Sequence, residues 1–251
     1  DKAETQNKAV EIALNFPQEG TTARNINSSD SFLSNLRSML SSYKNVPIYL
    51  RIGAEFNVWG DKCTPDEFVS AFKAVANSVS GLSNVATVWS MAHTSSWKTN
   101  DWPYTADDFY PGDEYVDWCA YSYFGQPDQV MIEFARMKGK PVFIAESTPV
   151  FQKGQTYFDA DIKKPEIARK IWDEWFTKFF SVIEKNSDVV KAFSYINVEW
   201  LSQPMWIVNV TFQQCDSRIQ QSEYVSNHWK EKVSGNGYIH AAELDWSKLP
   251  Q

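Results

Sequence analysis

Short apolar strands alternate with amphipathic helices along most of this 251-residue chain. The strands are apolar on both faces, which is typical of a parallel sheet covered by helices on each side. The alternation predicts about six successive βα units and an α/β fold. We expect strands at 9–16, 46–52, 84–90, 115–121, 141–145 and 189–196, and helices at 32–43, 64–79, 127–137, 165–185 and 216–233.

The loops that follow the strands are long and rich in Trp, Asn, Asp and His, whereas the loops that precede them are short. In a (β/α)8 TIM barrel the active site lies at the carboxyl ends of the strands. A doubly wound sheet is the alternative, but no glycine-rich phosphate-binding turn follows the first strand. We therefore predict a single barrel domain over residues 1–251, because no polar linker divides the chain.

Aromatic residues are unusually frequent, with 11 Trp, 11 Tyr and 16 Phe. Aromatic rings with polar edges suit the apolar faces of sugars. The net charge of −7 argues against a nucleic-acid partner, and no apolar stretch is long enough to span a membrane. Two glycosylation sequons, at Asn27 and Asn209, favour a secreted or extracellular protein.

Carboxylates stand at or near the ends of several predicted strands. Glu55 follows the second strand, Glu146 ends the fifth, Glu199 follows the sixth, and Asp113 precedes the fourth. A buried carboxylate is costly unless it is paired, so each could instead be a structural ion pair or a loop cap. Two glutamates across a cleft are the arrangement that glycoside hydrolysis requires.

Six segments resemble glycoside hydrolase family 26, in the clan of retaining β-glycanases that includes mannanases, lichenases and β-1,3-xylanases. The resemblance extends from about residue 46 to the end of the chain. The segments are RIGAEFNVWG (51–60), VWSMAHTSSW (88–97), YPGDEYVDW (110–118), PVFIAES (141–147), INVEW (196–200) and CDSRIQQS (215–222).

The resemblance implies that Glu55 is the general acid/base, that Glu146 is the nucleophile, and that Trp200 is a platform beneath the sugar. It implies no metal and no organic cofactor. Two positions depart from the family. Ala54 stands where the family has His, and Phe124 stands where it has Tyr, so Tyr123 is the candidate to contact the nucleophile.

The resemblance also places Glu55 at the end of the fourth barrel strand. Barrel strands one and two would then be absent, and a missing N-terminal segment or a second chain would have to supply them. We predict a polysaccharide or oligosaccharide substrate, bound by residues near the strand ends. Those candidates are Arg51, Asn57, Trp59, His93, Trp97, Tyr123, Glu199 and Trp200. Arg51 could also pair with Glu146. A non-catalytic sugar-binding protein on the same scaffold is the alternative function.

Overall fold

The computed structural model describes residues 8–16, 22–58, 63–93, 104–149, 160–203, 215–235 and 237–240. The chain divides into two compact units. The first comprises Asp1–Tyr121, Val130–Val142 and Ile239–Gln251, and the second comprises Ser122–Gln129 and Phe143–Tyr238. Within the described ranges, no helix has the length and apolar character needed to cross a membrane.

Parallel strands form the centre of the first unit. They are β1 (Val10–Leu14), β2 (Ile48–Ile52), β3 (Val85–Met91) and the first part of β4 (Trp118–Tyr123). Each strand pairs in parallel with the next one along the chain, with Val10 opposite Ile48 and Ile48 opposite Val85. Continuous apolar sequence predicts burial on both faces, and nearly all of β2 is buried.

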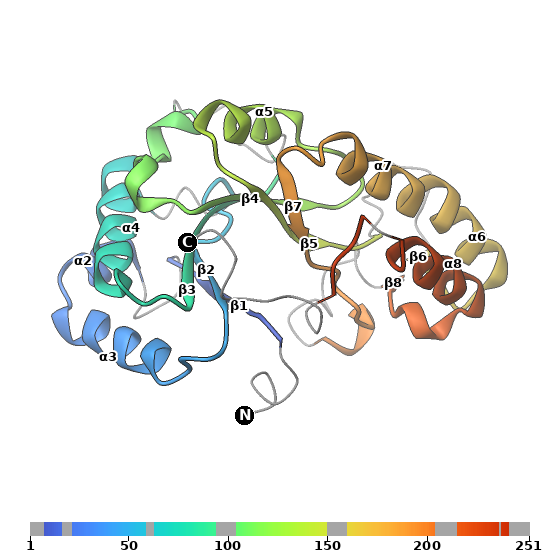
Figure 1. Cartoon of the computed structure of the whole chain (residues 1–251), viewed down its shortest axis with the longest axis horizontal. Coiled ribbons are helices and arrows are strands. Elements are labelled where there is room, and N and C mark those ends of the chain that lie inside the picture. The colour runs from blue at the N-terminus through green and yellow to red at the C-terminus, as the bar shows by residue number, and fades with distance from the viewer. Residues whose placement is uncertain are drawn as a thin grey trace. The chain divides into compact units, whose positions relative to one another are not determined.

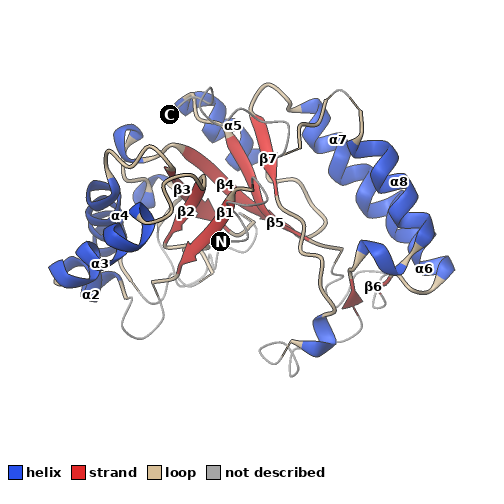
Figure 2. Ribbon diagram, turned by 60° about the horizontal axis from the view of Figure 1, so that its bottom comes forward, coloured by secondary structure: helices blue, strands red, loops and turns tan. Residues whose placement is uncertain are grey.

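Helices α2 (Ala23–Asn27), α3 (Asp30–Ser41) and α4 (Pro65–Val79) lie together on one side of β1, β2 and β3 (Figures 1 and 2). A capping box begins α4: the Thr64 hydroxyl accepts from the Glu67 amide, and the Glu67 carboxylate accepts from the Thr64 amide. The fully buried Phe68 of α4 packs against Phe16, Phe56 and Phe109. This aromatic contact fixes α4 against the sheet.

The YPGDEYVDW segment fixes the entry to β4. Asp117 accepts hydrogen bonds from the backbone amide and the hydroxyl of Thr87 in β3, at 2.7 and 3.0 Å. The Asp113 carbonyl accepts a hydrogen bond from Lys140. The Asp117 carboxylate and the Asp113 backbone therefore both hold the segment that enters β4. Helix α5 (Gln129–Lys138) follows the strand.

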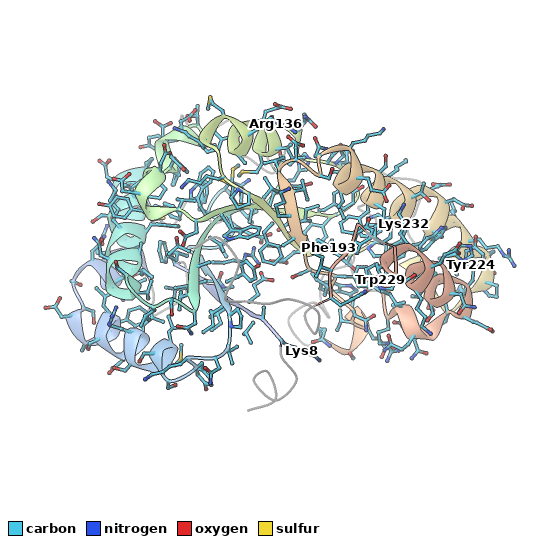
Figure 3. The ribbon with its side chains drawn as sticks, in the orientation of Figure 1. Lys8, Arg136, Phe193, Tyr224, Trp229 and Lys232 are labelled. Carbon is cyan, nitrogen blue, oxygen red and sulfur yellow. The ribbon has the colours of Figure 1, made fainter. Side chains whose placement is uncertain are left out.

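The second unit holds all but the first residue of β5 (Val142–Ser147), together with β7 (Val190–Phe193), α8 (Glu223–Val233) and a long helix of three parts. That helix runs from α6 (Pro165–Ile171) through a π turn at Trp172–Phe176 into α7 (Thr177–Lys185). Its aromatic side chains pack against those of β7 and α8. Phe193 and Trp229 lie side by side in this core, with ring centroids 6.1 Å apart (Figure 3).

The hydrogen-bonded order of the six-stranded sheet is β1-β2-β3-β4-β5-β7. The bonds from Cys119 to Pro141 and from Thr148 to Tyr123 advance together along β4 and β5, as parallel pairing requires. A doubly wound sheet reverses its strand order at a switch point, and this order has none. The fold is therefore that of a partial (β/α)8 TIM barrel, and the doubly wound alternative is excluded.

The last predicted helix was placed too early. Residues Cys215–Asp216 form β8, which pairs with β6 (Ala160–Asp161), and a short 3-10 turn follows at Ile219–Gln221. The helix begins at Glu223, because the Ser222 hydroxyl accepts from the Val225 amide as its N-cap. The sequence pattern predicted a helix from residue 216 because it does not distinguish the short extended segment before Ser222 from the first turns of the helix.

Candidate active site

Glu55 lies in a tight turn just after β2. Its φ of 56° is in the left-handed region, and it is the one non-glycine residue of the described chain with a positive φ. Two backbone hydrogen bonds hold this turn: the Glu55 amide donates to the Ser90 carbonyl at 3.0 Å, and the Val58 amide donates to the Glu55 carbonyl at 2.9 Å. Such strain in a non-glycine residue is concentrated at functional sites.

Gly53 makes this turn possible. Its φ is 63°, and a Cβ there would lie 2.4 Å from a ring atom of Phe68 and 2.8 Å from one of Phe16. The backbone therefore passes directly over the buried aromatic cluster beneath α4. Ala54, which stands where the family has His, is buried next to it.

Arg51 is buried beneath the Glu55 turn, with 3% of its side chain exposed. Its guanidinium donates to Glu11 of β1 at 2.9 Å, and to the Ser90 hydroxyl of β3 at 3.0 and 3.2 Å. The Ser90 hydroxyl thus accepts hydrogen bonds from the Arg51 guanidinium, and the Ser90 carbonyl accepts one from the Glu55 amide. Arg51 joins three neighbouring strands, and its predicted pairing with Glu146 stays a prediction.

Asn57 is 5% exposed and binds the backbone that follows β3. Its amide nitrogen donates to the His93 carbonyl at 3.1 Å, and its amide oxygen accepts from the Ala92 nitrogen at 2.8 Å. The loop after β2 is therefore tied to the loop after β3. This geometry gives Asn57 a structural role and fixes the backbone of His93.

Glu146 is part of β5 in the second unit. It is half-buried, whereas Ala145 and Ser147 on either side of it are buried. The Ser147 carbonyl accepts from the Ile196 amide at 2.8 Å, and the Ile144 carbonyl accepts from the Ser194 amide at 2.8 Å. Pairing with the strand segment around β7 thus fixes the backbone on both sides of Glu146.

Tyr123 ends β4 and is fully buried. Its ring packs against Trp175 and Phe179 of the long helix, with centroids 5.4 and 5.1 Å away. Its hydroxyl has no hydrogen-bond partner among the described residues, and burial raises its pKa well above the usual value. The ring is part of the aromatic core, and its predicted contact with Glu146 stays a prediction.

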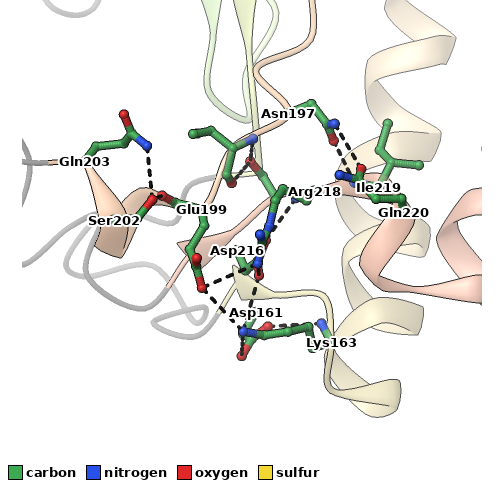
Figure 4. A network of polar contacts seen from close by, with 12 residues as sticks. Asp161, Lys163, Asn197, Glu199, Ser202, Gln203, Asp216, Arg218, Ile219 and Gln220 are labelled. Carbon is green, nitrogen blue, oxygen red and sulfur yellow. Dashed lines mark hydrogen bonds and ion pairs between the residues drawn. The ribbon is translucent and has the colours of Figure 1, made fainter.

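Glu199 belongs to a network of charged side chains in the second unit (Figure 4). Its carboxylate lies 3.4 Å from Arg218 and 3.7 Å from Lys163. Both cations also contact Asp216, whose side chain is 4% exposed. Glu199 therefore takes part in ion pairs rather than standing alone. Trp200, the next residue, begins a short 3-10 helix and is 5% exposed.

The candidate site residues fall into two sets. Arg51, Glu55, Asn57 and His93 belong to the first unit, and Tyr123, Glu146, Glu199 and Trp200 belong to the second. Trp59 and Trp97 lie outside the described residues. The pairing of Glu55 with Glu146 across a cleft stays a prediction.

Sequence reasoning missed Glu11, Ser90, Lys163 and Asp216. Glu11 and Ser90 lie on strands next to Arg51, a neighbourhood that strand register alone reveals. Asp216 lies in the CDSRIQQS segment, which resembles the family. That resemblance points to the segment but does not identify Arg218 and Lys163 as the partners of Asp216. Among the described residues, no group of three His, Cys, Asp or Glu side chains is arranged to hold a metal ion.

The model of glycosyl hydrolase family 26 matches residues 2–194. The chain belongs to this family. Among curated proteins, two named β-1,3-xylanase are similar to it in alignments of 219 residues, which cover 79% of this chain. One from Alcaligenes sp. is 30% identical, and one from Vibrio sp., named β-1,3-xylanase TXYA, is 32% identical. The matches cover 45% and 46% of those proteins, so the chain spans about half their length.

A solved family 26 structure supports the fold. The catalytic domain of the endo-β-1,4-mannanase from Bacillus sp. JAMB-750 superposes with a TM-score of 0.58. The match covers 98% of this chain and 71% of that one, at 16% sequence identity. At this identity the likeness supports the partial barrel fold and nothing finer. The family expected from the six sequence segments is confirmed.

Proposed function

We propose that this protein hydrolyses a β-linked polysaccharide with retention of the anomeric configuration. Family 26 membership and the β-1,3-xylanase relatives support hydrolysis of a β-glycan. The observation that bears most directly on the site is the left-handed backbone of Glu55 at a strand end, held by the Ser90 carbonyl. A left-handed backbone is strained in a non-glycine residue, and such strain is typical of positions where function requires one fixed side-chain orientation.

In this mechanism Glu146 is the nucleophile. A carboxylate oxygen of Glu146 attacks the anomeric carbon while the glycosidic C–O bond breaks, and Glu55 gives its proton to the leaving oxygen. Glu55 then removes a proton from water, and the water oxygen displaces the Glu146 carboxylate. Two inversions give net retention. The mechanism requires Glu55 to be protonated and Glu146 to be ionised in the free enzyme.

For the substrate we propose β-1,3-xylan, since the two curated relatives are named for it. β-Mannan and mixed-linkage β-glucan are the other candidates. His93, Trp59, Trp97 and Trp200 are proposed to contact the sugar. Arg51 and Asn57 are proposed to hold the loops that contact it, because both are buried, Arg51 is bound to a neighbouring strand and Asn57 to the loop after β3. We further propose that residues 1–251 act as one catalytic barrel domain, in a protein that works outside the cell.

The test uses Glu146→Ala and Glu55→Ala with a β-1,3-xylobioside that carries a dinitrophenyl leaving group. Glu146→Ala is expected to abolish turnover, and added azide should restore it with an α-glycosyl azide as product, because azide attacks once from the vacated face. In Glu55→Ala, azide should instead intercept the glycosyl-enzyme and give the β-glycosyl azide. Hydrolysis of xylan by Glu55→Ala should fall by about 10² to 10⁴-fold.

Glu231→Ala is the matched control, because Glu231 is exposed on α8. It should leave turnover and products unchanged. If Glu146→Ala hydrolyses xylan as fast as the parent protein, the assignment of the nucleophile is wrong. If the parent protein binds xylan and cleaves none of the three polysaccharides, and Glu146→Ala keeps the same affinity, the protein is a sugar-binding relative.

A further inference from the structure

The CDSR segment at 215–218 lies against the chain that follows β7, and the two are joined by backbone as well as side-chain contacts. Glu199 and Asp216 form an antiparallel bridge. The Ser217 amide donates to the Val198 carbonyl at 2.9 Å, and the Ile219 amide donates to the Asn197 side chain at 2.7 Å. The residues just before Trp200 are therefore paired in register with this segment.

Ser217 strengthens this pairing from the interior. It is fully buried, and its hydroxyl lies 2.8 Å from the Ile196 carbonyl and 2.9 Å from the Val198 carbonyl. Its own carbonyl accepts from the Tyr195 hydroxyl at 2.7 Å. Tyr195 in turn contacts Phe176 and Trp229 in the aromatic core of the unit. The pairing is thereby connected to the rigid core.

Asp216 is the centre of the charged network. Arg218 binds it through two nitrogens, with Nε 2.9 Å from one carboxylate oxygen and Nη2 2.6 Å from the other. Lys163 lies 3.3 Å from Asp216, and also contacts Glu199 and Asp161. A guanidinium that binds a buried carboxylate in this two-pronged way has a fixed orientation, so it presents Nη2 to Glu199 in one place.

We propose that Asp216, Arg218 and Lys163 are positioning residues that hold Glu199, and with it Trp200, in the geometry that substrate binding needs. This inference rests on the proposed function, since it takes Trp200 to contact the sugar. It changes the expected role of Glu199. The carboxylate is used to hold the segment at 196–203 in place rather than to bind sugar hydroxyls.

The experiment compares Arg218→Met and Arg218→Lys with the parent protein, and Lys230→Met, an exposed cation on α8, is the control. The first readout is hydrogen exchange of the backbone amides at 196–203 and 215–221. Arg218→Met should speed exchange there and leave α4 unchanged, and Arg218→Lys should do so less. Lys230→Met should change neither. Unchanged exchange at 196–203 in Arg218→Met overturns the positioning role.

The second readout is steady-state kinetics on β-1,3-xylan. Arg218→Met should raise KM about tenfold, equivalent to about 1.4 kcal/mol of binding, with a smaller effect on kcat. In a Trp200→Phe background the same substitution should add little, because the two residues act on one contact. If Arg218→Met speeds hydrogen exchange but leaves KM unchanged, the inference is contradicted. It is also contradicted if Arg218→Met raises KM as much in the Trp200→Phe background as in the parent protein. If the parent protein is inactive, the proposed function fails and hydrogen exchange alone decides whether the segment is held.

Discussion

Asn57 lies two residues after the catalytic candidate Glu55, but its side chain has a structural role. Both polar ends of its amide bind backbone atoms of the loop after β3, and the side chain is buried. Its place two residues after Glu55 favoured substrate binding in the sequence, because a loop Asn near a strand end is often a ligand residue. Which backbone atoms surround it depends on the neighbouring strand, and local sequence does not contain that information.

Asn57→Ala should lower the free energy of unfolding by about 1–3 kcal/mol, because it leaves the buried Ala92 amide without its hydrogen-bond acceptor. Urea denaturation of the variant and the parent protein measures the difference. Asn25→Ala, at an exposed position on α2, is the control and should change stability by less than about 0.5 kcal/mol. Equal stability of Asn57→Ala and the parent protein would show that the amide does not tie the two loops together.

Asp216 should make stability depend on acid pH. Burial alone would raise its pKa, but hydrogen bonds from Arg218 and Lys163 outweigh burial and hold the pKa below its usual value. A lowered folded pKa contributes stability that is present above the unfolded pKa of about 3.9, and is lost as pH falls through the folded pKa. Glu199 and Asp161 are ion-paired with the same cations.

Asp216→Asn should therefore be less stable than the parent protein at pH 7 and should lose less stability as the pH falls below about 4. Unfolding free energies from urea titrations at pH 7 and at several values between pH 5 and pH 2 give the two slopes. Parallel slopes would mean that Asp216 is not ion-paired in solution as it is in Figure 4.

At the scale of the elements, the sequence located all six predicted strands and four of the five predicted helices to within about three residues. The predictions succeeded where one face or both faces of an element are buried, as in β2 and α4. They failed where tertiary pairing decides, as in the short β6 and β8, and where periodicity does not resolve a local change, as in the π turn at Trp172–Phe176. The π turn presents Trp175 and Phe176 to the core within a helix that reads as continuous.

The capping box of α4 was predictable from Thr64, Pro65 and Glu67, and its contribution to stability can be tested. Thr64→Ala should lower the free energy of unfolding by about 1 kcal/mol, because the Glu67 amide loses its acceptor. Ser70→Ala removes an exposed hydroxyl from the middle of the same helix and should be neutral or slightly stabilising. Thermal or urea denaturation compares them. Equal effects of the two substitutions would contradict a specific capping role.

At the scale of the whole molecule, the strand order and the family were predictable because both depend on patterns that extend through the chain. The candidate site is predicted from residue types at strand ends. Its connections are not, because Arg51 reaches Glu11 and Ser90, and Glu199 reaches Lys163 and Arg218, through side chains that meet across elements. The chain spans about half the length of its curated relatives, so its activity as a whole protein must be measured.

The most direct test of retaining hydrolysis is the anomeric configuration of the first product. Proton NMR recorded during the first minutes of β-1,3-xylan hydrolysis distinguishes the α and β anomeric protons before mutarotation mixes them. The two-step mechanism through Glu146 predicts that the β anomer is released first and that the α anomer grows in later. Initial release of the α anomer would mean single displacement by water, and would contradict the assignment of Glu146 as nucleophile.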